Sequence, residues 1–229
     1  MKHFASPFRL GAVLALATVG AAALVFAQRP APQPPPTAPA AAATQVKIKA
    51  IPRPGKGVMV STPDFGARAT GLSQPLSRGR PKEWAVIDVT YETKSPAKWT
   101  DNVYVTFYVM TEGMTPDRKK ELSFYTLRVQ YVNVADGEHR AGVVLAPSTL
   151  ERFGQGGVVA IAAEITADGA AQPDVKSEHT LSDLNPYKDD WWKNDRILNA
   201  EIVKRRDGLL ERSKTPFGLI HMDDYEAVR

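Results

Sequence analysis

The chain has 229 residues, with 29 Lys and Arg against 25 Asp and Glu, and it contains no cysteine. The first 27 residues hold only the charges of Lys2 and Arg9, so the remainder carries 27 basic against 25 acidic residues, a net charge of +2. This near balance argues against a nucleic-acid-binding protein, and the lack of cysteine excludes disulfides and thiolate metal sites.

Residues 1–27 are predicted to form an export signal. Lys2 and Arg9 precede an uncharged apolar run from Leu10 to Ala27, and the small or modest residues before Gln28 predict cleavage after Ala27. This run also reaches the roughly 17–25 residues of a spanning helix, so an uncleaved anchor is the alternative. We therefore expect the folded part in the periplasm or at the outer cell surface, touching a membrane only through this segment if it is uncleaved.

Residues 28–44 are rich in proline and alanine, which predicts a semi-rigid extended linker. Alternation of apolar and polar residues then begins and predicts a strand at Gln45 to Ala50. Val58 and Val60 continue the alternation after a turn at Pro54-Gly55. Residues 61–81 lack periodicity and are predicted to form a long loop.

Three longer runs follow with strand periodicity. Trp84 to Thr93 places Ala85, Ile87, Val89 and Tyr91 on one apolar face. Val103 to Met110 is bulky on both faces, which predicts a central strand. Leu122 to Val134 is a long aromatic and β-branched run with room for a bend.

Turn signals organise the next part of the chain. Asp136-Gly137 predicts a hairpin that pairs 127–134 with 138–145. Pro147 to Phe153 is predicted to form a short helix with Ser148 as its N-cap and Gly154 as its stop. Val158 to Thr166 is the next predicted strand, with alanines that permit close packing of two sheets, and Asp168-Gly169 predicts a second hairpin.

About seven short strands with regular turns and almost no helix predict an all-β fold over residues 45–186. The expected architecture is an antiparallel two-layer β-sandwich of the immunoglobulin-like class. An open barrel of similar strand number is the alternative.

Residues 187–229 are predicted to form a short helical and extended C-terminal extension. Asp189 to Arg206 carries a loose helical stripe that Asp189 or Asp190 could cap. Leu209 and Leu210 are expected to pack back on the domain. Beyond them the tail either docks on the domain or binds a partner, and the candidate partner-binding residues are Thr215, Pro216, Phe217 and Tyr225.

No group of residues predicts catalysis, a cofactor or a metal site. The four histidines, at positions 3, 139, 179 and 221, have no metal-ligand spacing, and no nucleophile elbow or phosphate-binding loop occurs. Asp183, Asp189 and Asp190 could bind calcium but lack alternating ligands, and helix capping explains the last two. The tryptophans at positions 84, 99, 191 and 192 raise the alternative of a sugar-stacking platform.

Two stretches carry a family resemblance. The first runs from Ser148 to Gly154 and precedes the apolar strand that ends at Asp168-Gly169; the second runs from Leu209 to Phe217, with Tyr225-Glu226 near the terminus. Over residues 45 to 229 the chain resembles the verrucomicrobial type IV pilus-associated immunoglobulin-like proteins, encoded beside pilus-like secretion genes in mucus-dwelling bacteria. The resemblance implies an envelope protein with an immunoglobulin-like fold, related to folds of archaeal pilus subunits.

Two functions follow as hypotheses. The first is a non-catalytic exported envelope protein, a component or accessory of a type IV pilus-like assembly, whose partners are other envelope proteins of that apparatus. Since Leu16 stands where a pilin leader places glutamate, an accessory role fits better than a filament subunit. The second is a surface β-sandwich module that binds glycans or host molecules.

Overall fold

The structure, a computed structural model, describes residues 43–62, 82–155, 157–219 and 225–226. The predicted export signal, almost all of the predicted linker and residues 63–81 of the predicted loop lie outside them. In these described ranges, no helix has the length and apolar character that a membrane crossing requires.

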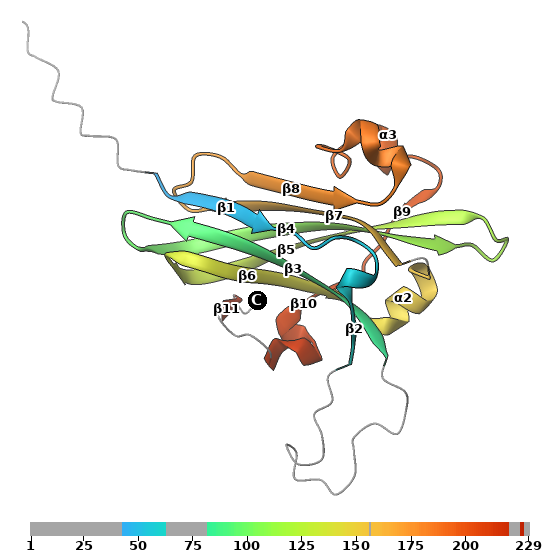
Figure 1. Ribbon diagram of the computed structural model, residues 1–229, viewed down its shortest axis with the longest axis horizontal. Coiled ribbons are helices and arrows are strands. Elements are labelled where there is room, and N and C mark those ends of the chain that lie inside the picture. Colours follow the sequence, from blue (N-terminus) through green and yellow to red (C-terminus); the bar gives the residue numbers. More distant parts are fainter. Residues whose placement is uncertain (1–42, 63–81, 156, 220–224, 227–229) are drawn as a thin grey trace, which may run out of the picture. The chain divides into compact units, whose positions relative to one another are not determined.

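The described residues form an all-β sandwich of two sheets (Figure 1). The first sheet has the order β1-β3-β6-β10, with β2 also beside β3. Its strands are β1 (Gln45–Ala50), β2 (Met59–Ser61), β3 (Glu83–Lys94), β6 (Gly137–Leu145) and β10 (Leu209–Glu211).

The second sheet has the order β11-β5-β4-β7-β8, with β9 also beside β5. Its strands are β4 (Trp99–Met114), β5 (Lys120–Ala135), β7 (Gly157–Ala167), β8 (Asp174–His179), β9 (Val203–Arg205) and β11 (Tyr225–Glu226). Every pair of these strands is antiparallel except β5 with β9, which is parallel. The predicted sandwich class is therefore confirmed.

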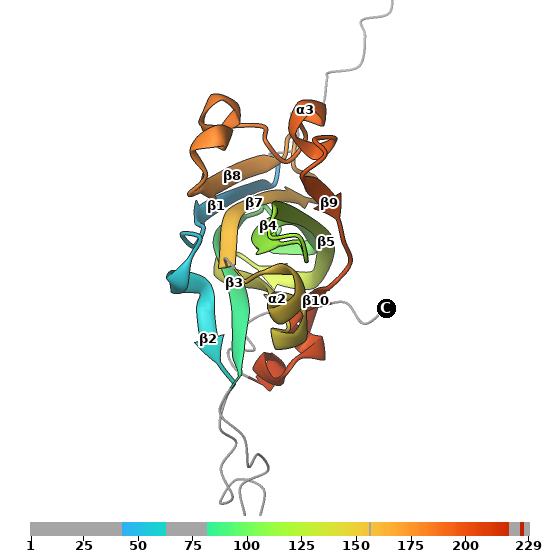
Figure 2. The ribbon, with the colours of Figure 1, turned by 90° about the vertical axis from the view of Figure 1, so that its right-hand side faces the viewer.

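The inner faces of the sheets enclose the main core. The alternation predicted for β3 is confirmed, since all four residues of its apolar face are fully buried. They pack with Val103, Val105, Phe107 and Val109 of β4 and with Ile161, Ala163 and Ile165 of β7. Helix α2 (Pro147–Phe153) covers one end of this core, where Leu150 is buried (Figure 2).

A second core explains why β4 is bulky on both faces. The outer face of the second sheet is covered by the segment that holds η2 (Ser182–Tyr187), a 3₁₀ helix, and α3 (Asp195–Leu198). This segment places Leu184, Trp191, Trp192 and Leu198 against Met110, Phe124, Ala160 and Ala162. The second sheet is thus buried on both sides, as expected of β4, which lies between β5 and β7.

The predicted hairpin of 127–134 with 138–145 is wrong. The Asp136-Gly137 turn carries the chain from one sheet to the other, because β5 pairs with β4 whereas β6 pairs with β3. Both strands turn their apolar residues into the shared core and face each other across it; the Gly142 amide donates to the Tyr131 hydroxyl at 3.1 Å. The dipeptide correctly predicted a tight reversal, but a turn does not decide which neighbour supplies the hydrogen bonds.

Two helix predictions also need correction. Ser148 does not cap α2; the cap is Ala146, and Pro147 at the first position supplies a preset φ in place of a side-chain cap. The predicted helix over 189–206 is reduced to α3, which Asn194 caps by accepting from the Arg196 amide at 3.0 Å. The chain before Asn194 turns instead so that both tryptophans enter the second core.

The three last described strands, β9, β10 and β11, pair with strands of both sheets. β9 pairs with β5, β10 with β6, and β11 again with β5. Gly208 lies between β9 and β10 with a φ of +142°, and a Cβ at this position would lie 3.1 Å from Thr149 Cγ2. Leu209 is buried, as predicted. We refer to residues 203–219 as the C-terminal strap.

Candidate functional site

Three of the predicted partner-binding residues lie in the strap and contact this chain itself. Phe217 is only 5% exposed, and its ring centroid lies 5.6 Å from that of Trp84 in an edge-to-face arrangement. The Thr215 hydroxyl donates to the Arg212 carbonyl at 2.8 Å and accepts from the Phe217 amide at 3.3 Å. Pro216 is half-buried. Of the predicted set, Phe217 is therefore buried within this chain.

The backbone of the fourth residue, Tyr225, is placed at a sheet edge. It belongs to β11 and pairs with Val132 of β5. Tyr225 thus pairs with a strand of the second sheet, whereas Phe217 contacts Trp84 of β3 in the first sheet.

Arg212 fixes the strap on the outer face of the first sheet. Its guanidinium Nη1 lies 3.6 Å from Asp88 Oδ1, and its Nε donates to the Phe217 carbonyl at 3.2 Å. Gly142 is opposite Asp88 in the ladder, and a Cβ there would lie 2.2 Å from Asp88 Oδ1. Glycine is needed at this position so that the carboxylate can lean across β6 toward Arg212.

The four tryptophans do not form a common platform. Trp191 and Trp192 are buried in the second core. Trp84 is half-buried against Phe217, and its Nε1 donates to the Thr62 hydroxyl at 3.0 Å. Trp99 is 57% exposed and stands at the start of β4.

The histidines that the structure describes are also apart. His139 contacts the Ala135 carbonyl at 2.8 Å and stacks near Tyr91, while His179 contacts the Leu181 carbonyl at 3.1 Å. Across the described ranges no three His, Asp or Glu side chains converge in a way that could hold a metal ion.

The exposed end of the β4–β5 hairpin is a different kind of surface. Met114 ends β4 and is 63% exposed, and Ile202, just before β9, is 46% exposed. Met114 lines one hollow with Arg118 and Arg152, and Ile202 lines a second hollow with Lys204 and with the acidic Glu121 and Glu201. Arg118, Arg152 and Lys204 are all exposed. We call Met114, Arg118, Arg152, Ile202 and Lys204 the hairpin-end surface.

Arg206 lines the hollow that Met114, Arg118 and Arg152 share. Its guanidinium forms an ion pair with Glu121, its Nε donates to the Ser123 hydroxyl at 2.9 Å, and it stacks 3.8 Å from the centroid of the Phe153 ring. The Arg152 guanidinium lies 4.7 Å from the same ring. Aromatic contacts of this kind favour arginine and hold its planar fork in place.

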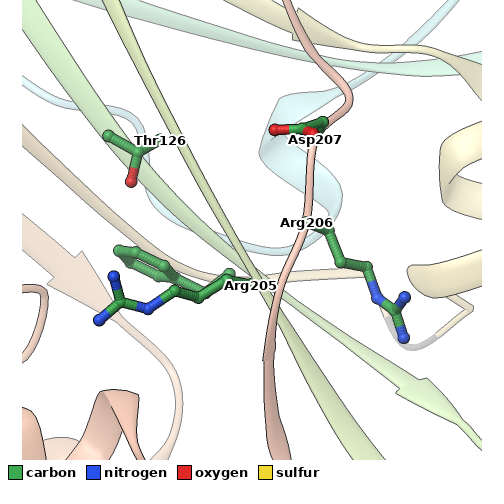
Figure 3. Close-up of a pocket in the computed structure, with 5 residues that line it drawn as sticks. Thr126, Arg205, Arg206 and Asp207 are labelled. Atoms are coloured by element: carbon green, nitrogen blue, oxygen red, sulfur yellow. The ribbon is translucent and has the colours of Figure 1, made fainter.

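Two hollows meet at Arg206. The larger, of about 580 Å³, is lined by Met114, Arg118, Glu121, Arg152, Phe153 and Arg206 among others. The smaller, of about 390 Å³, lies where the chain leaves β9; Figure 3 shows Arg205, Arg206 and Asp207 around it, with Thr126 opposite. A volume of several hundred cubic ångströms is enough for a small ligand or a few side chains.

The larger hollow is cationic. It has three arginines and one glutamate, and only Arg206 forms an ion pair with that glutamate. In the part of the chain that the structure describes, neither Arg118 nor Arg152 has a carboxylate partner. The surface can therefore accept negatively charged groups and, beside them, apolar ones at Met114 and Phe153.

Sequence reasoning did not find this surface. Its residues come from the end of β4, from α2 and from the segment around β9, which lie far apart along the chain. The only sequence signal was an unusual density of Arg and Lys in 118–120 and 204–206, which near-neutral overall charge concealed.

Two tyrosines of the second sheet, the buried Tyr125 and the half-buried Tyr108, have raised pKa values. Burial raises the pKa of the Tyr125 hydroxyl more than the neighbouring Thr111, Ser123 and Arg206 lower it. Burial and then the Glu164 carboxylate raise the pKa of Tyr108, whose hydroxyl lies 3.4 Å from that carboxylate. Both hydroxyls therefore stay protonated at physiological pH.

Comparison with known proteins gives the family context. A protein-family model matches residues 39–229. Among solved structures, the crystal structure of a protein from Akkermansia muciniphila aligns with a TM-score of 0.59 and 21% sequence identity, covering 81% of this chain and 94% of that one. No curated protein sequence matches this chain.

Proposed function

Because this chain belongs to the family whose model matches residues 39–229, and shares its fold with a protein of the verrucomicrobium Akkermansia, we propose that it is a non-catalytic exported envelope protein. It serves a type IV pilus-like assembly, as a component or accessory, through protein–protein contacts. Its place of action is the periplasm or the outer cell surface.

The observation that carries this proposal is the hairpin-end surface. Large apolar side chains of the described residues are mostly buried in the two cores, and Val60, Trp99, Met114 and Ile202 are the exposed ones. Met114 and Ile202 line neighbouring hollows that also hold the exposed Arg118, Arg152 and Lys204. Methionine and arginine are enriched in protein interfaces, where a flexible thioether and a planar cation adapt to a partner surface. A rigid sandwich that presents such an end is suited to binding another protein.

The strap is assigned a structural role in this proposal. The sequence favoured the tail around Phe217 as the contact, but Phe217 is buried on Trp84 and Arg212 is anchored at Asp88. We therefore assign the strap a structural role and the hairpin end the partner contact. A tail that holds both sheets together also fixes β9, and with it Ile202, beside the hairpin.

Site-specific crosslinking in living envelopes tests the proposal. A photoreactive amino acid is placed at position 114 or 202, with position 99, an exposed apolar residue at the opposite end of β4, as the matched control. The expected result is one dominant adduct from both hairpin-end positions, identified as a protein of the pilus-like apparatus, and none from position 99.

Either of two results would contradict the proposal. One is the absence of any adduct at both hairpin-end positions in cells that produce the apparatus. The other is an adduct that forms equally well from position 99, because contact without a preferred end is not an assembly interface.

A further inference from the structure

We propose that the larger hollow of the hairpin-end surface binds an acidic segment of a partner protein, with Arg118 and Arg152 receiving its carboxylates. This inference rests on the proposed function and specifies the chemistry of the partner. We call the site the arginine hollow, formed by Met114, Arg118, Arg152, Phe153 and Arg206.

Two of the three arginines that line the hollow have no carboxylate partner among the described residues. Arg206 is already neutralised by Glu121. Arg118 and Arg152 line the same hollow, and within the described ranges no Asp or Glu pairs with either of them. A hollow with two unpaired guanidinium groups attracts carboxylates, which arginine binds through two parallel hydrogen bonds.

Arg152 and Arg206 are held in place by the Phe153 ring before any ligand binds. The Phe153 ring carries both Arg152 and Arg206, at 4.7 and 3.8 Å from its centroid. Phe153 itself is held at the end of α2, where its carbonyl accepts from the Thr111 hydroxyl at 2.8 Å. An arginine already held by an aromatic ring loses less conformational freedom when it binds a carboxylate.

The mixed lining of the hollow favours a polypeptide over other anions. The hollow is not purely cationic, since Met114, Pro116 and Phe153 supply an apolar wall beside the guanidinium groups. Glutamate and aspartate in a peptide bring carboxylates and neighbouring apolar side chains together, which fits such a mixed lining. A nucleic acid or sulfated glycan would need a longer basic track, and the Lys120–Glu112 and Arg206–Glu121 pairs interrupt one here.

Fluorescence anisotropy with the purified full chain tests the inference. The probes are a labelled peptide of alternating leucine and glutamate, the same peptide with glutamine replacing glutamate, and a labelled heparin oligosaccharide. The test variant is Arg118→Gln with Arg152→Gln. The matched control is Arg53→Gln with Arg196→Gln, two exposed arginines elsewhere on the described surface.

The acidic peptide should bind the wild-type chain, more weakly as salt rises, while the glutamine peptide should not. The test variant should bind the acidic peptide about tenfold more weakly or worse, because two charge-assisted contacts are lost, and the control variant should bind as the wild type does. Unfolding midpoints measured for both variants establish that the loss is one of binding.

Three results would overturn the inference. They are no binding of the acidic peptide, equal loss of binding in the test and control variants, and selective, arginine-dependent binding of heparin instead of peptide. These outcomes leave the crosslinking result untouched, because a partner trapped at positions 114 and 202 need not present an acidic segment.

Discussion

At the scale of single residues, Asp88, Gly142 and Arg212 show how one small side chain permits another contact. Arg212 is only 8% exposed, and a buried guanidinium is costly unless an anion and hydrogen-bond acceptors surround it. Asp88 supplies the anion from the neighbouring strand β3, but only because Gly142 leaves the space that its carboxylate occupies.

Substituting Gly142→Ala should therefore destabilise the protein. The added methyl group would overlap Asp88 Oδ1 and push the carboxylate away from Arg212, with an expected loss of about 1–3 kcal/mol in the free energy of unfolding. Urea denaturation measures it. Gly57→Ala is the control, because nothing lies within 4 Å of a Cβ at that position; equal losses in both variants would refute the steric explanation.

Tyr125 makes a prediction about alkaline pH. Its pKa is raised in the folded protein by burial, whereas in the unfolded chain it ionises near pH 10. The stability that the neutral side chain contributes is therefore complete below about pH 10 and is lost as the pH rises through the higher folded-state pKa.

The variant Tyr125→Phe cannot ionise at this position. At neutral pH it should unfold at nearly the same urea concentration as the wild type. Above pH 10 it should unfold at a higher urea concentration than the wild type. Denaturation midpoints across this range supply the measurement. Parallel curves for the two proteins would mean that Tyr125 does not contribute to the alkaline loss.

At the scale of elements, the part of the strap that follows β10 packs across the first sheet. β10 continues that sheet beside β6, and η3 (Arg212–Lys214) and η4 (Pro216–Leu219), two 3₁₀ turns, then bring Phe217 to Trp84. Leu209 and Phe217, two apolar residues of the strap, are thus buried within the same chain.

Removing the Phe217 ring should weaken this packing. Phe217→Ala is expected to cost about 3 kcal/mol, the lower end of the range for a buried phenylalanine. It should also loosen Trp84, which near-UV circular dichroism would detect. Pro216→Ala, at a half-buried neighbour, should have a much smaller effect; an unchanged stability of Phe217→Ala would show that the strap is dispensable.

At the scale of the whole molecule, the described residues after 186 (187–219 and 225–226) complete both sheets and the second core. The predicted domain boundary lies at residue 186, before the helical stripe of Asp189 to Arg206. In the structure, Trp191 and Trp192 cover the outer face of the second sheet, and β9 and β10 pair with strands of different sheets. A sandwich without this segment would expose Met110 and Phe124.

A chain that ends at Pro186 should therefore fail to fold cooperatively. We expect broad unfolding, weak near-UV dichroism and binding of a hydrophobic dye, as for compact states that lack fixed packing. A chain of residues 40–229 is the matched control and should unfold in one sharp transition. Cooperative unfolding of the shorter chain would show instead that the sandwich is complete at residue 186.

The residue pattern alone predicts the local elements. Strict alternation in Trp84 to Thr93 identified a strand and its buried face, and bulk on both sides of Val103 to Met110 identified a central strand. Gly154 marked the end of α2. These predictions succeeded because each rests on neighbours within one strand or turn, where the period of the backbone decides which side chains share a face.

Which elements pair or pack together depends on the packing of the whole fold. The turn at Asp136-Gly137 fixed a reversal but not its partner strand, and the helical stripe after Asp189 was overridden by the gain from burying two tryptophans. The arginine hollow assembles Met114, Arg152 and Arg206 from three separate segments. No spacing along the chain encodes such a site, because its geometry arises from the packing of two sheets and the strap that joins them.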